Sequence, residues 1–359
     1  MVEEFESIEK LAEEIKNKFD SSNSNKKIIT LYAFNATGKT RLANIFNEED
    51  SKEEIEDTYI KSLCYSAFLE DIFKWDNDNY ILLFDKNDWI IKFIKDQGLA
   101  NKIIDCFKDI TNSKIEPVFD FSSGEVYFKI ASGDEQNESN IKISRGEESI
   151  LIWSIFYTVL ETVMDVLNED ESTRSTQEFN NLKYIIIDDP VSSIDDTKII
   201  SIAVRLSYII DCCEDSYINF LITTHHALFY NVIFNSLKKE GYILSRHEKI
   251  LRLEKQKGDS PFGYHLLLKE TIKNAIVGNK IEKYHFNLFR NLLEKTANFL
   301  GIEYWGDCVS GDKRDEFLRK INLYSHSKLS DIEPKDLSNE DKEIFKQTFD
   351  TFIKKYFHE

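Results

Sequence analysis

The sequence predicts an α/β fold with a parallel-rich sheet, followed by a small, mainly α-helical C-terminal domain. The unbroken apolar run at residues 184–187 and the mainly apolar run INFLIT at 218–223 flank a segment of helical periodicity at 197–212. Such runs indicate strands buried on both faces of a sheet and joined by crossover helices. Beyond the polar stretch KQKGDSPFG the pattern becomes mostly helical. We therefore expect one domain at residues 1–253 and a second at 254–359.

The other elements follow along the chain. The N-terminal stretch MVEEFESIEKLAEEIKNKF predicts an acidic amphipathic helix without the basic start or apolar core of a signal peptide. Residues 27–33 (KIITLYA) predict a short strand that ends at a turn. Residues 52–111 alternate aromatic and acidic positions with helical periodicity, and 114–131 predict a hairpin with Ser-Ser-Gly as its turn. A further helix is expected at 149–167.

Composition and charge limit the class of protein. The 359 residues carry a net charge of −18, which argues against a protein that coats nucleic acid non-specifically. Residues 254–330 hold 13 Lys and Arg against 10 Asp and Glu, so this segment is the one expected to face an anion. The five cysteines form no CxxC pair, and no run of 18 apolar residues predicts a membrane span. These features are typical of a cytoplasmic globular protein.

A phosphate-binding loop is predicted directly after the first buried strand. The string AFNATGKT runs from Ala33 to Thr40 and opens the next predicted helix. Backbone N–H groups at a helix N-terminus face phosphates, Lys39 would reach the β and γ oxygens, and the Thr40 hydroxyl would bind Mg²⁺. Ala33 stands where the first glycine of such loops is usual. The candidate nucleotide-binding residues are Asn35, Ala36, Thr37, Gly38, Lys39, Thr40 and Arg41.

Two carboxylates end a later buried strand. Asp188 and Asp189 directly follow the apolar run YIII. We expect Asp188 to help hold Mg²⁺ together with Thr40, and Asp189 to polarise the water that attacks the nucleotide. A solvated strand end explains one aspartate, but it does not explain the whole string IIIDDPVSSID.

The motifs together, in this order, resemble those of the ABC/SMC-like class of P-loop ATPases. ISRGEE resembles the ABC signature, which binds the γ-phosphate held by the opposite subunit, and PVSSID resembles the D-loop, which crosses a dimer interface. TTHH ends the next predicted strand, where this class keeps a histidine that contacts the γ-phosphate. The residues that match are Ser144, Gly146 and Glu147 of the signature, Asp195 of the D-loop, and His225 or its neighbour His226.

This resemblance implies an ATPase that works as a homodimer or higher homo-oligomer. The signature serves a nucleotide held by a second copy, and the chain carries one set of motifs, so ATP is expected to drive closure of two copies. The implied cofactors are ATP and Mg²⁺, with GTP or a deoxynucleotide left open.

The C-terminal segment offers a second group of polar residues. Arg290 and Glu294 are four apart in a strongly periodic helix and share one face. The string INLYSHS, with Asn322 and His326, follows later. On residue types alone, a salt bridge on an exposed helix and a surface histidine explain these residues.

Nearly the whole chain resembles the PrrC/RloC group of bacterial anticodon nucleases. The strings that carry this resemblance are YAFNATGKTRL, AFLEDIFKWDND, ISRGEE, IIIDDPVSSID and TTHH, together with the C-terminal Arg, Glu and His. The length between the P-loop and the signature, without a zinc-hook CxxC, is closer to PrrC. The resemblance implies that Arg290, Glu294 and His326 form a ribonuclease triad, that tRNA is the substrate and that the ATPase is a gate. It also implies a role in defence against phage and a type I restriction-modification complex as a partner.

Such a triad can cleave RNA without a metal ion. Glu294 or His326 would take the proton of the ribose 2′-OH, the other would protonate the leaving 5′-oxygen, and Arg290 would stabilise charge on the phosphate. The products would be 2′,3′-cyclic phosphate and 5′-OH ends. An alternative function is an ATPase switch or scaffold of a phage-defence system, whose C-terminal domain binds a partner effector. A DNA-repair ATPase similar to RecF fits the motifs but not the acidic charge.

Overall fold

The chain forms two compact units, Met1–Phe262 and Gly263–Glu359. The computed structural model describes residues 2–21, 27–48, 60–65, 72–130, 141–191, 194–213, 218–237, 240–247, 249–256, 263–311, 313–325 and 337–357. The domain boundary expected after residue 253 falls inside a strand that ends at Lys255 and pairs with two neighbours. Its ladder hydrogen bonds hold these last residues in the first unit, and each unit is described separately below.

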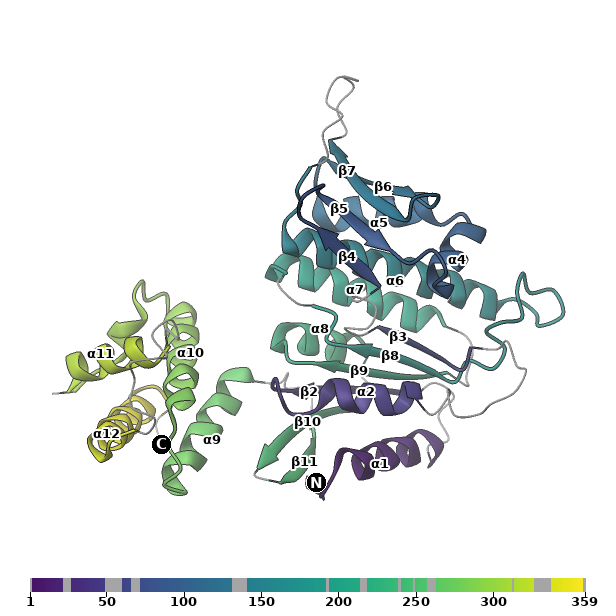
Figure 1. Ribbon diagram of the computed structural model, residues 1–359. Coiled ribbons are helices and arrows are strands. Elements are labelled where there is room, and N and C mark those ends of the chain that lie inside the picture. Colours follow the sequence, from purple (N-terminus) through teal and green to yellow (C-terminus); the bar gives the residue numbers. More distant parts are fainter. Residues whose placement is uncertain are drawn as a thin grey trace. The chain divides into compact units, whose positions relative to one another are not determined.

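A seven-stranded sheet forms the centre of the first unit (Figure 1), in the order β1-β11-β10-β2-β9-β8-β3. Neighbours from β10 to β3 run parallel, whereas β11 pairs antiparallel with both β10 and β1. This arrangement confirms the predicted α/β class with a parallel-rich sheet. The strands are β1 (Val2–Phe5), β2 (Lys27–Ala33), β3 (Ser62–Tyr65), β8 (Tyr184–Asp188), β9 (Asn219–Thr224), β10 (Glu240–His247) and β11 (Ile250–Lys255).

Helices cover both faces of this sheet, which explains the unbroken apolar strands. In β8, Ile185 and Ile187 belong to one buried cluster, and Ile186, which points to the opposite face, belongs to another. The cluster of Ile186 is completed by α1 (Ile8–Ser21) and α2 (Lys39–Glu48). The opposite cluster includes residues of α6 (Arg145–Asn168), α7 (Asp196–Cys212) and α8 (Ala227–Leu237).

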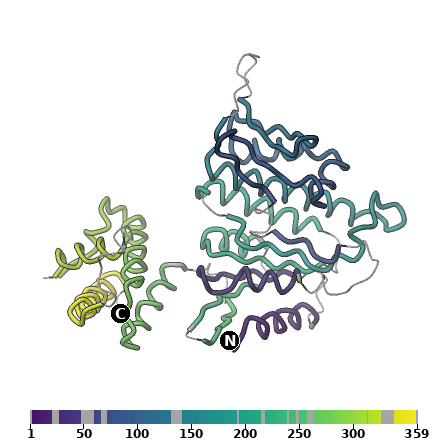
Figure 2. Tube along the Cα trace, in the orientation of Figure 1, coloured from purple at the N-terminus to yellow at the C-terminus, as the bar shows by residue number. Residues whose placement is uncertain are grey.

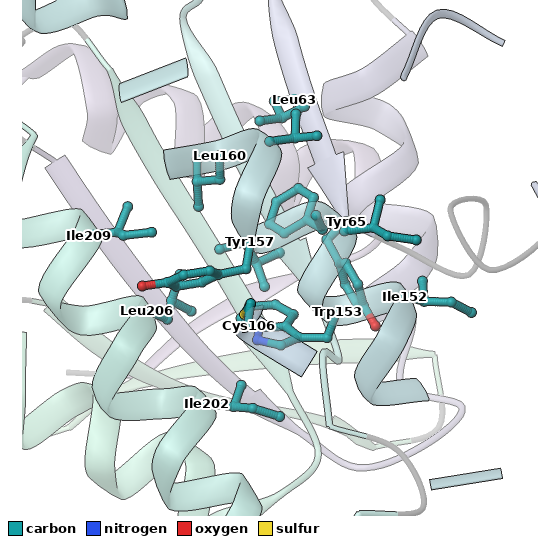
Figure 3. Packing of buried hydrophobic residues seen from close by; sticks show 14 of the residues in the cluster. Leu63, Tyr65, Cys106, Ile152, Trp153, Tyr157, Leu160, Ile202, Leu206 and Ile209 are labelled. Carbon is teal, nitrogen blue, oxygen red and sulfur yellow. The ribbon is translucent and has the colours of Figure 1, made fainter. Parts of the chain in front are cut away.

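A second, four-stranded antiparallel sheet packs on the far side of α6 (Figure 1), in the order β4-β5-β7-β6. Figure 3 shows the core around α6, where the Trp153 ring lies 5.3 Å from that of Tyr65 on β3. Because α6 is buried between two layers, it is apolar all round. The added elements are β4 (Phe73–Asp76), β5 (Ile81–Phe84), α4 (Trp89–Asp96), α5 (Ala100–Thr111), β6 (Ile115–Asp120) and β7 (Glu125–Ile130).

Helix α6 is also long and apolar enough to cross a membrane by length and composition. Among the described residues it is the one such helix, and 83% of its most apolar window is buried inside the unit. Its side chains already pack against α5, α7 and both sheets, so we assign it as a core helix. The expected cytoplasmic location stays a prediction.

Two expectations about local structure are wrong, and one is confirmed. The N-terminal stretch is not helical throughout, because Val2–Phe5 adds an edge strand to β11, and Figure 2 shows the purple N-terminal end beside the green strand. Among the described residues of 52–111, the expected helical periodicity holds for α4 and α5, whereas β3, β4 and β5 are strands. These strands are four residues long, too short for period 2 to be distinguished from period 3.6. The hairpin at 114–131 is confirmed as β6 and β7.

The second unit is helical, as predicted, and has its own core. Phe289 on α10 contacts the rings of Phe317, Phe345, Phe349 and Phe352 at centroid distances of 5.2 to 5.5 Å. A cluster of large buried rings of this kind lets fewer than a hundred residues hold together. The elements are α9 (Tyr264–Val277), α10 (Lys283–Leu300), the 3-10 turn η2 (Trp305–Cys308), α11 (Arg314–Ser325) and α12 (Asn339–Tyr356).

Candidate functional site

The loop between β2 and α2 has the backbone of a phosphate-binding loop. Ala36 and Gly38 have φ angles of 62° and 115°, both in the left-handed region. A Cβ at Gly38 would lie 2.7 Å from Cδ1 of Ile8, so the position favours glycine both for its φ and for its close approach to α1. The loop therefore turns sharply from the end of the strand into the N-terminus of α2, where backbone N–H groups attract anions.

Lys39 is held across the mouth of this loop. Its side chain is 6% exposed, and Nζ donates to the carbonyl oxygens of Ala33 at 3.1 Å and Phe34 at 3.3 Å. Nζ also lies 3.4 Å from Oδ2 of Asp189. A buried ammonium group needs such partners, and these partners point it toward the space where phosphates would lie.

Asp188 ends β8 beside the neighbouring strand β9. The parallel register places it opposite Thr223, whose hydroxyl donates to Oδ1 of Asp188. Burial raises the pKa of Asp188, and the Thr223 and Thr40 hydroxyl groups act in the opposite direction. The contact with Thr40 brings together the two residues expected to bind Mg²⁺.

Asp189 forms the centre of a polar network. Its φ of 54° is in the left-handed region, and its N–H donates to the Thr223 carbonyl at 2.8 Å. The His225 N–H donates to Oδ1 at 3.1 Å, and His225 Nδ1 lies 2.6 Å from both carboxylate oxygens. Burial opposes ionisation of Asp189, but the hydrogen bond from His225 and the charges of His225 and Lys39 outweigh it and lower the pKa.

The geometry separates the two adjacent histidines. The His225 ring contacts Asp189, whereas the His226 N–H donates to Oγ1 of Thr224 at 3.0 Å. The His226 Nε2 lies 4.0 Å from Asp196, at the start of α7. Of the two, His225 is therefore the one whose ring is joined to Asp189.

These residues border a pocket of about 260 Å³ at the carboxyl ends of β2 and β8. Ligands of open α/β sheets bind at this edge. Thr37 is buried and does not line the pocket, and Arg41 lines it while also forming an ion pair with Glu9 of α1. The lining residues are Asn35, Ala36, Gly38, Lys39, Thr40, Arg41 and Asp189. The site fits a nucleoside triphosphate with Mg²⁺. It offers a loop with residues at positive φ, a helix N-terminus, a buried lysine and a hydroxyl–carboxylate pair.

The signature and D-loop residues lie at two other helix starts. Ser144 caps α6 in a capping box, in which its hydroxyl accepts from the Glu147 N–H at 3.2 Å and Glu147 Oε2 accepts from the Ser144 N–H at 2.8 Å. Gly146 is half-buried in the first turn of that helix. Asp195 caps α7 by accepting from the Lys198 N–H at 3.1 Å, and hydrogen bonds from Thr197 and Lys198 lower its pKa to about 2. These residues do not line the pocket described above.

Arg290 of the second unit joins three elements. Its Nε donates to Oε1 of Glu294 at 2.9 Å, one turn later on α10, as the spacing predicts. Its Nη1 donates to Oδ1 of Asn322 on α11 at 3.2 Å. Its guanidinium carbon lies 5.1 Å from the centre of the Trp305 ring in η2. The Arg290 side chain is 21% exposed and that of Glu294 is 40% exposed, so both remain accessible to a ligand.

Several contacts of both sites were missed at the level of sequence. Thr223 supports Asp188 and its neighbour, and the parallel pairing of β8 with β9 could have indicated it. Trp305 and Asn322 contact Arg290, but no sequence periodicity links residues in three different elements. His326, the third predicted member of the triad, lies outside the described residues and follows Ser325, the last residue of α11, in the sequence.

The chain is similar to a bacterial protein over nearly its full length. No family model matches it. It is 40% identical over 346 residues to a protein of Escherichia coli described as "Anticodon nuclease", and the match covers 90% of this chain and 87% of that protein. A solved structure, the SMC head bound to the C-terminal winged-helix domain of ScpA, aligns with 66% of this chain and 91% of that chain, with a TM-score of 0.34 and 10% identity.

Proposed function

This chain belongs to the anticodon nuclease family, and on that basis we propose that it cuts a tRNA within the anticodon loop, gated by ATP in its first unit. The observation that carries the proposal is the accessible pair of Arg290 and Glu294, joined at 2.9 Å. A guanidinium beside a carboxylate supplies charge for a phosphodiester and a proton acceptor within reach of each other. The +3 balance of Lys and Arg over Asp and Glu at residues 254–330 supports an anionic substrate.

The proposed reaction is a transesterification that uses no metal ion. The ribose 2′-oxygen attacks the adjacent phosphorus and loses its proton to Glu294 or His326. The bond from phosphorus to the 5′-oxygen breaks, and the other of these two residues gives that oxygen a proton. Arg290 stabilises the negative charge that builds up on the non-bridging oxygens. A 2′,3′-cyclic phosphate and a 5′-OH end result.

Asn322 supports His326 as the third member. His326 is four positions after Asn322, and the Asn322 contact brings the C-terminal turn of α11 to Arg290. A residue that follows this helix directly is therefore close in the chain to the Arg290 contact.

The first unit is proposed to bind ATP with Mg²⁺, or alternatively GTP or a deoxynucleotide. Lys39 and the loop N–H groups would hold the phosphates, Thr40 and Asp188 would hold the metal ion, and Asp189 with His225 would orient a water. Bound ATP supplies the free energy of a phosphoanhydride that water can cleave. The signature and D-loop residues lie outside this pocket, which supports the prediction that they bind nucleotide held by a second copy of the chain. These residues are Ser144, Gly146, Glu147 and Asp195.

ATP is therefore expected to close a homodimer. An Asp189→Asn variant is expected to bind ATP and to hydrolyse it slowly, so its molar mass by light scattering should double on addition of ATP and Mg²⁺. A mass that stays that of one chain would remove the dimer from the proposal. We further propose that the protein acts in the cytoplasm during the response to phage, restrained by a type I restriction-modification complex.

Cleavage is tested with purified protein, ATP and bulk tRNA. Cut ends should map to an anticodon loop, carry a 2′,3′-cyclic phosphate and disappear with His326→Ala. The proposed transesterification would be contradicted by cut ends with a 3′-OH or 5′-phosphate. Strict dependence of cleavage on a divalent ion at the RNA site would also contradict it. The tRNA could remain intact although ATP is hydrolysed, even when candidate partners are added to relieve restraint of the nuclease. This result would favour an ATPase switch that acts through a separate effector.

A further inference from the structure

Trp305, which contacts Arg290, and its neighbour Tyr304 form an aromatic pair that has no part in the proposed reaction. Tyr304 and Trp305 have ring centroids 5.5 Å apart, at an interplanar angle of 44°. Trp305 is the residue whose indole lies under the Arg290 guanidinium, at 5.1 Å. Tyr304 is 46% exposed, so part of its ring surface is available to a ligand.

The Tyr304 ring is held in place on one side. A Cβ on Gly306 would lie 2.3 Å from Cε1 of Tyr304, so the glycine lets the ring rest directly against the backbone. The Asp307 N–H donates to the Tyr304 carbonyl at 2.9 Å, which fixes the turn. The ring is thus packed on one side and open to solvent on the other.

The 3-10 turn that begins at Trp305, directly after Tyr304, is anchored to the core. Cys308 and Val309 are 0% and 3% exposed. Arg314 Nε donates to the Val309 carbonyl at 3.2 Å, and Nη2 donates to Asp307 at 2.9 Å. An anchored ring loses little conformational entropy when a ligand covers it, which favours binding.

We propose that Tyr304 is the stacking surface for an unpaired nucleobase next to the scissile phosphate, with Trp305 linking this surface to Arg290. The inference rests on the proposed function of Arg290 and Glu294. Single-stranded loops of RNA are recognised by bases that turn outward and stack on aromatic rings, while cations contact the backbone. Here the ring and the cation share Trp305 as a common neighbour, so a base and its adjacent phosphate can be held together.

Phe299 provides a matched control. It is 90% exposed and lies nine residues after Arg290 on α10. At 100° per residue, nine residues place it on the opposite side of the helix. It therefore has the same kind of side chain without the proximity to the Arg290 guanidinium.

The test measures binding without cleavage. Anticodon stem–loop RNAs, each with 2-aminopurine at one loop position, are titrated into the full-length Glu294→Gln variant, and anisotropy and 2-aminopurine fluorescence are followed. At one loop position the fluorescence should be quenched on binding. Adding Tyr304→Ala should weaken binding by about 5- to 150-fold and abolish the quenching. Tyr304→Phe, which keeps the ring, should restore both signals, and Phe299→Ala should change neither.

A change in the RNA completes the test. An abasic nucleotide at the quenched position should weaken binding to the Glu294→Gln protein by the same factor as Tyr304→Ala does. The same abasic RNA should bind the protein that also carries Tyr304→Ala no more weakly than the intact RNA does. Equal losses with Phe299→Ala, or no loss with Tyr304→Ala, would overturn the stacking proposal. RNA that stacks on Tyr304 but is never cut by the unsubstituted protein would instead overturn the proposed nuclease function. If neither the Glu294→Gln protein nor the unsubstituted protein binds any of the RNAs, both the stacking proposal and the proposed nuclease function are overturned.

Discussion

Glu294 accepts a 2.9 Å hydrogen bond from Nε of Arg290, one helical turn away on α10. The contact uses one edge of the guanidinium, and Nη1 binds Asn322 on the neighbouring helix. Arg290 is therefore fixed by two helices and by the Trp305 ring. A side chain held in this way is already oriented before a substrate arrives, which is the condition for stabilising a transition state efficiently.

Glu294→Gln should reduce tRNA cleavage by roughly 100- to 10,000-fold, because an amide cannot take or give the proton. ATP hydrolysis by the same preparation should remain unchanged, since Glu294 belongs to the second unit. Cleavage is measured as initial rates on end-labelled tRNA. Glu343→Gln, the same change at an exposed position on α12, is the control. Equal activities of the two variants would rule out Glu294 as an acid or base.

Trp305→Ala should lower kcat of cleavage by about 2- to 30-fold, the range expected for loss of a cation–π contact. Trp305 acts through Arg290, so the effect is expected in kcat more than in KM. Trp305→Phe should recover part of the rate because it keeps a ring face under the guanidinium. If kcat were unchanged and only KM rose, the role of Trp305 would lie in binding and not in the orientation of Arg290.

Lys39→Ala and Asp189→Asn should separate nucleotide binding from hydrolysis. Lys39 is nearly buried and lies at the phosphate side of the loop, so its loss should abolish ATP binding. Asp189→Asn should leave ATP binding intact and slow hydrolysis by roughly 100-fold or more, because the amide cannot activate water. Calorimetry and phosphate release measure the two steps. Retained ATP binding in the Lys39 variant would contradict the assignment of the loop.

Ser144 can be tested for a role beyond capping α6. Ser144→Ala removes the cap and should lower the free energy of unfolding by about 1 kcal/mol. Ser144→Asp keeps a good cap, since aspartate caps as well as serine. It should nevertheless block ATP-driven dimerisation, because its charge would repel the γ-phosphate. A Ser144→Asp variant that dimerises like the parent would limit Ser144 to its structural role.

His285 should make the second unit less stable in mild acid. The ring is 3% exposed, and Nδ1 accepts a 2.9 Å hydrogen bond from the Glu282 N–H, which requires the neutral form. Burial lowers the pKa of His285 below its ordinary value of 6.5. The unfolded chain therefore binds more protons, and stability is full above about pH 6.5 and falls as the pH decreases below it. Thermal unfolding at pH 7.5 and 5.5 should show a smaller difference between the parent and His285→Gln at pH 5.5. A difference that is the same at both pH values would refute this account.

The sequence by itself determined the fold class and the ATPase-like motifs. Apolar runs such as residues 184–187 predict a sheet covered on both faces, and GKT and the aspartate pair occur where such strands end. These patterns are local, and the carboxyl ends of parallel strands meet at one edge whatever the remaining loops do. The i,i+4 spacing is also a local pattern, so it was enough to predict the contact between Arg290 and Glu294.

Only the tertiary structure decided the contacts between distant segments. The structure makes His225 a partner of Asp189, because β8 and β9 end side by side and the His225 ring lies against the Asp189 carboxylate. It also formed β1 from a stretch with a helical pattern, since pairing with β11 outweighs local propensity over four residues. Trp305 reached Arg290 through packing of η2 on α10, a contact that depends on side-chain volumes in the core and has no period along the chain.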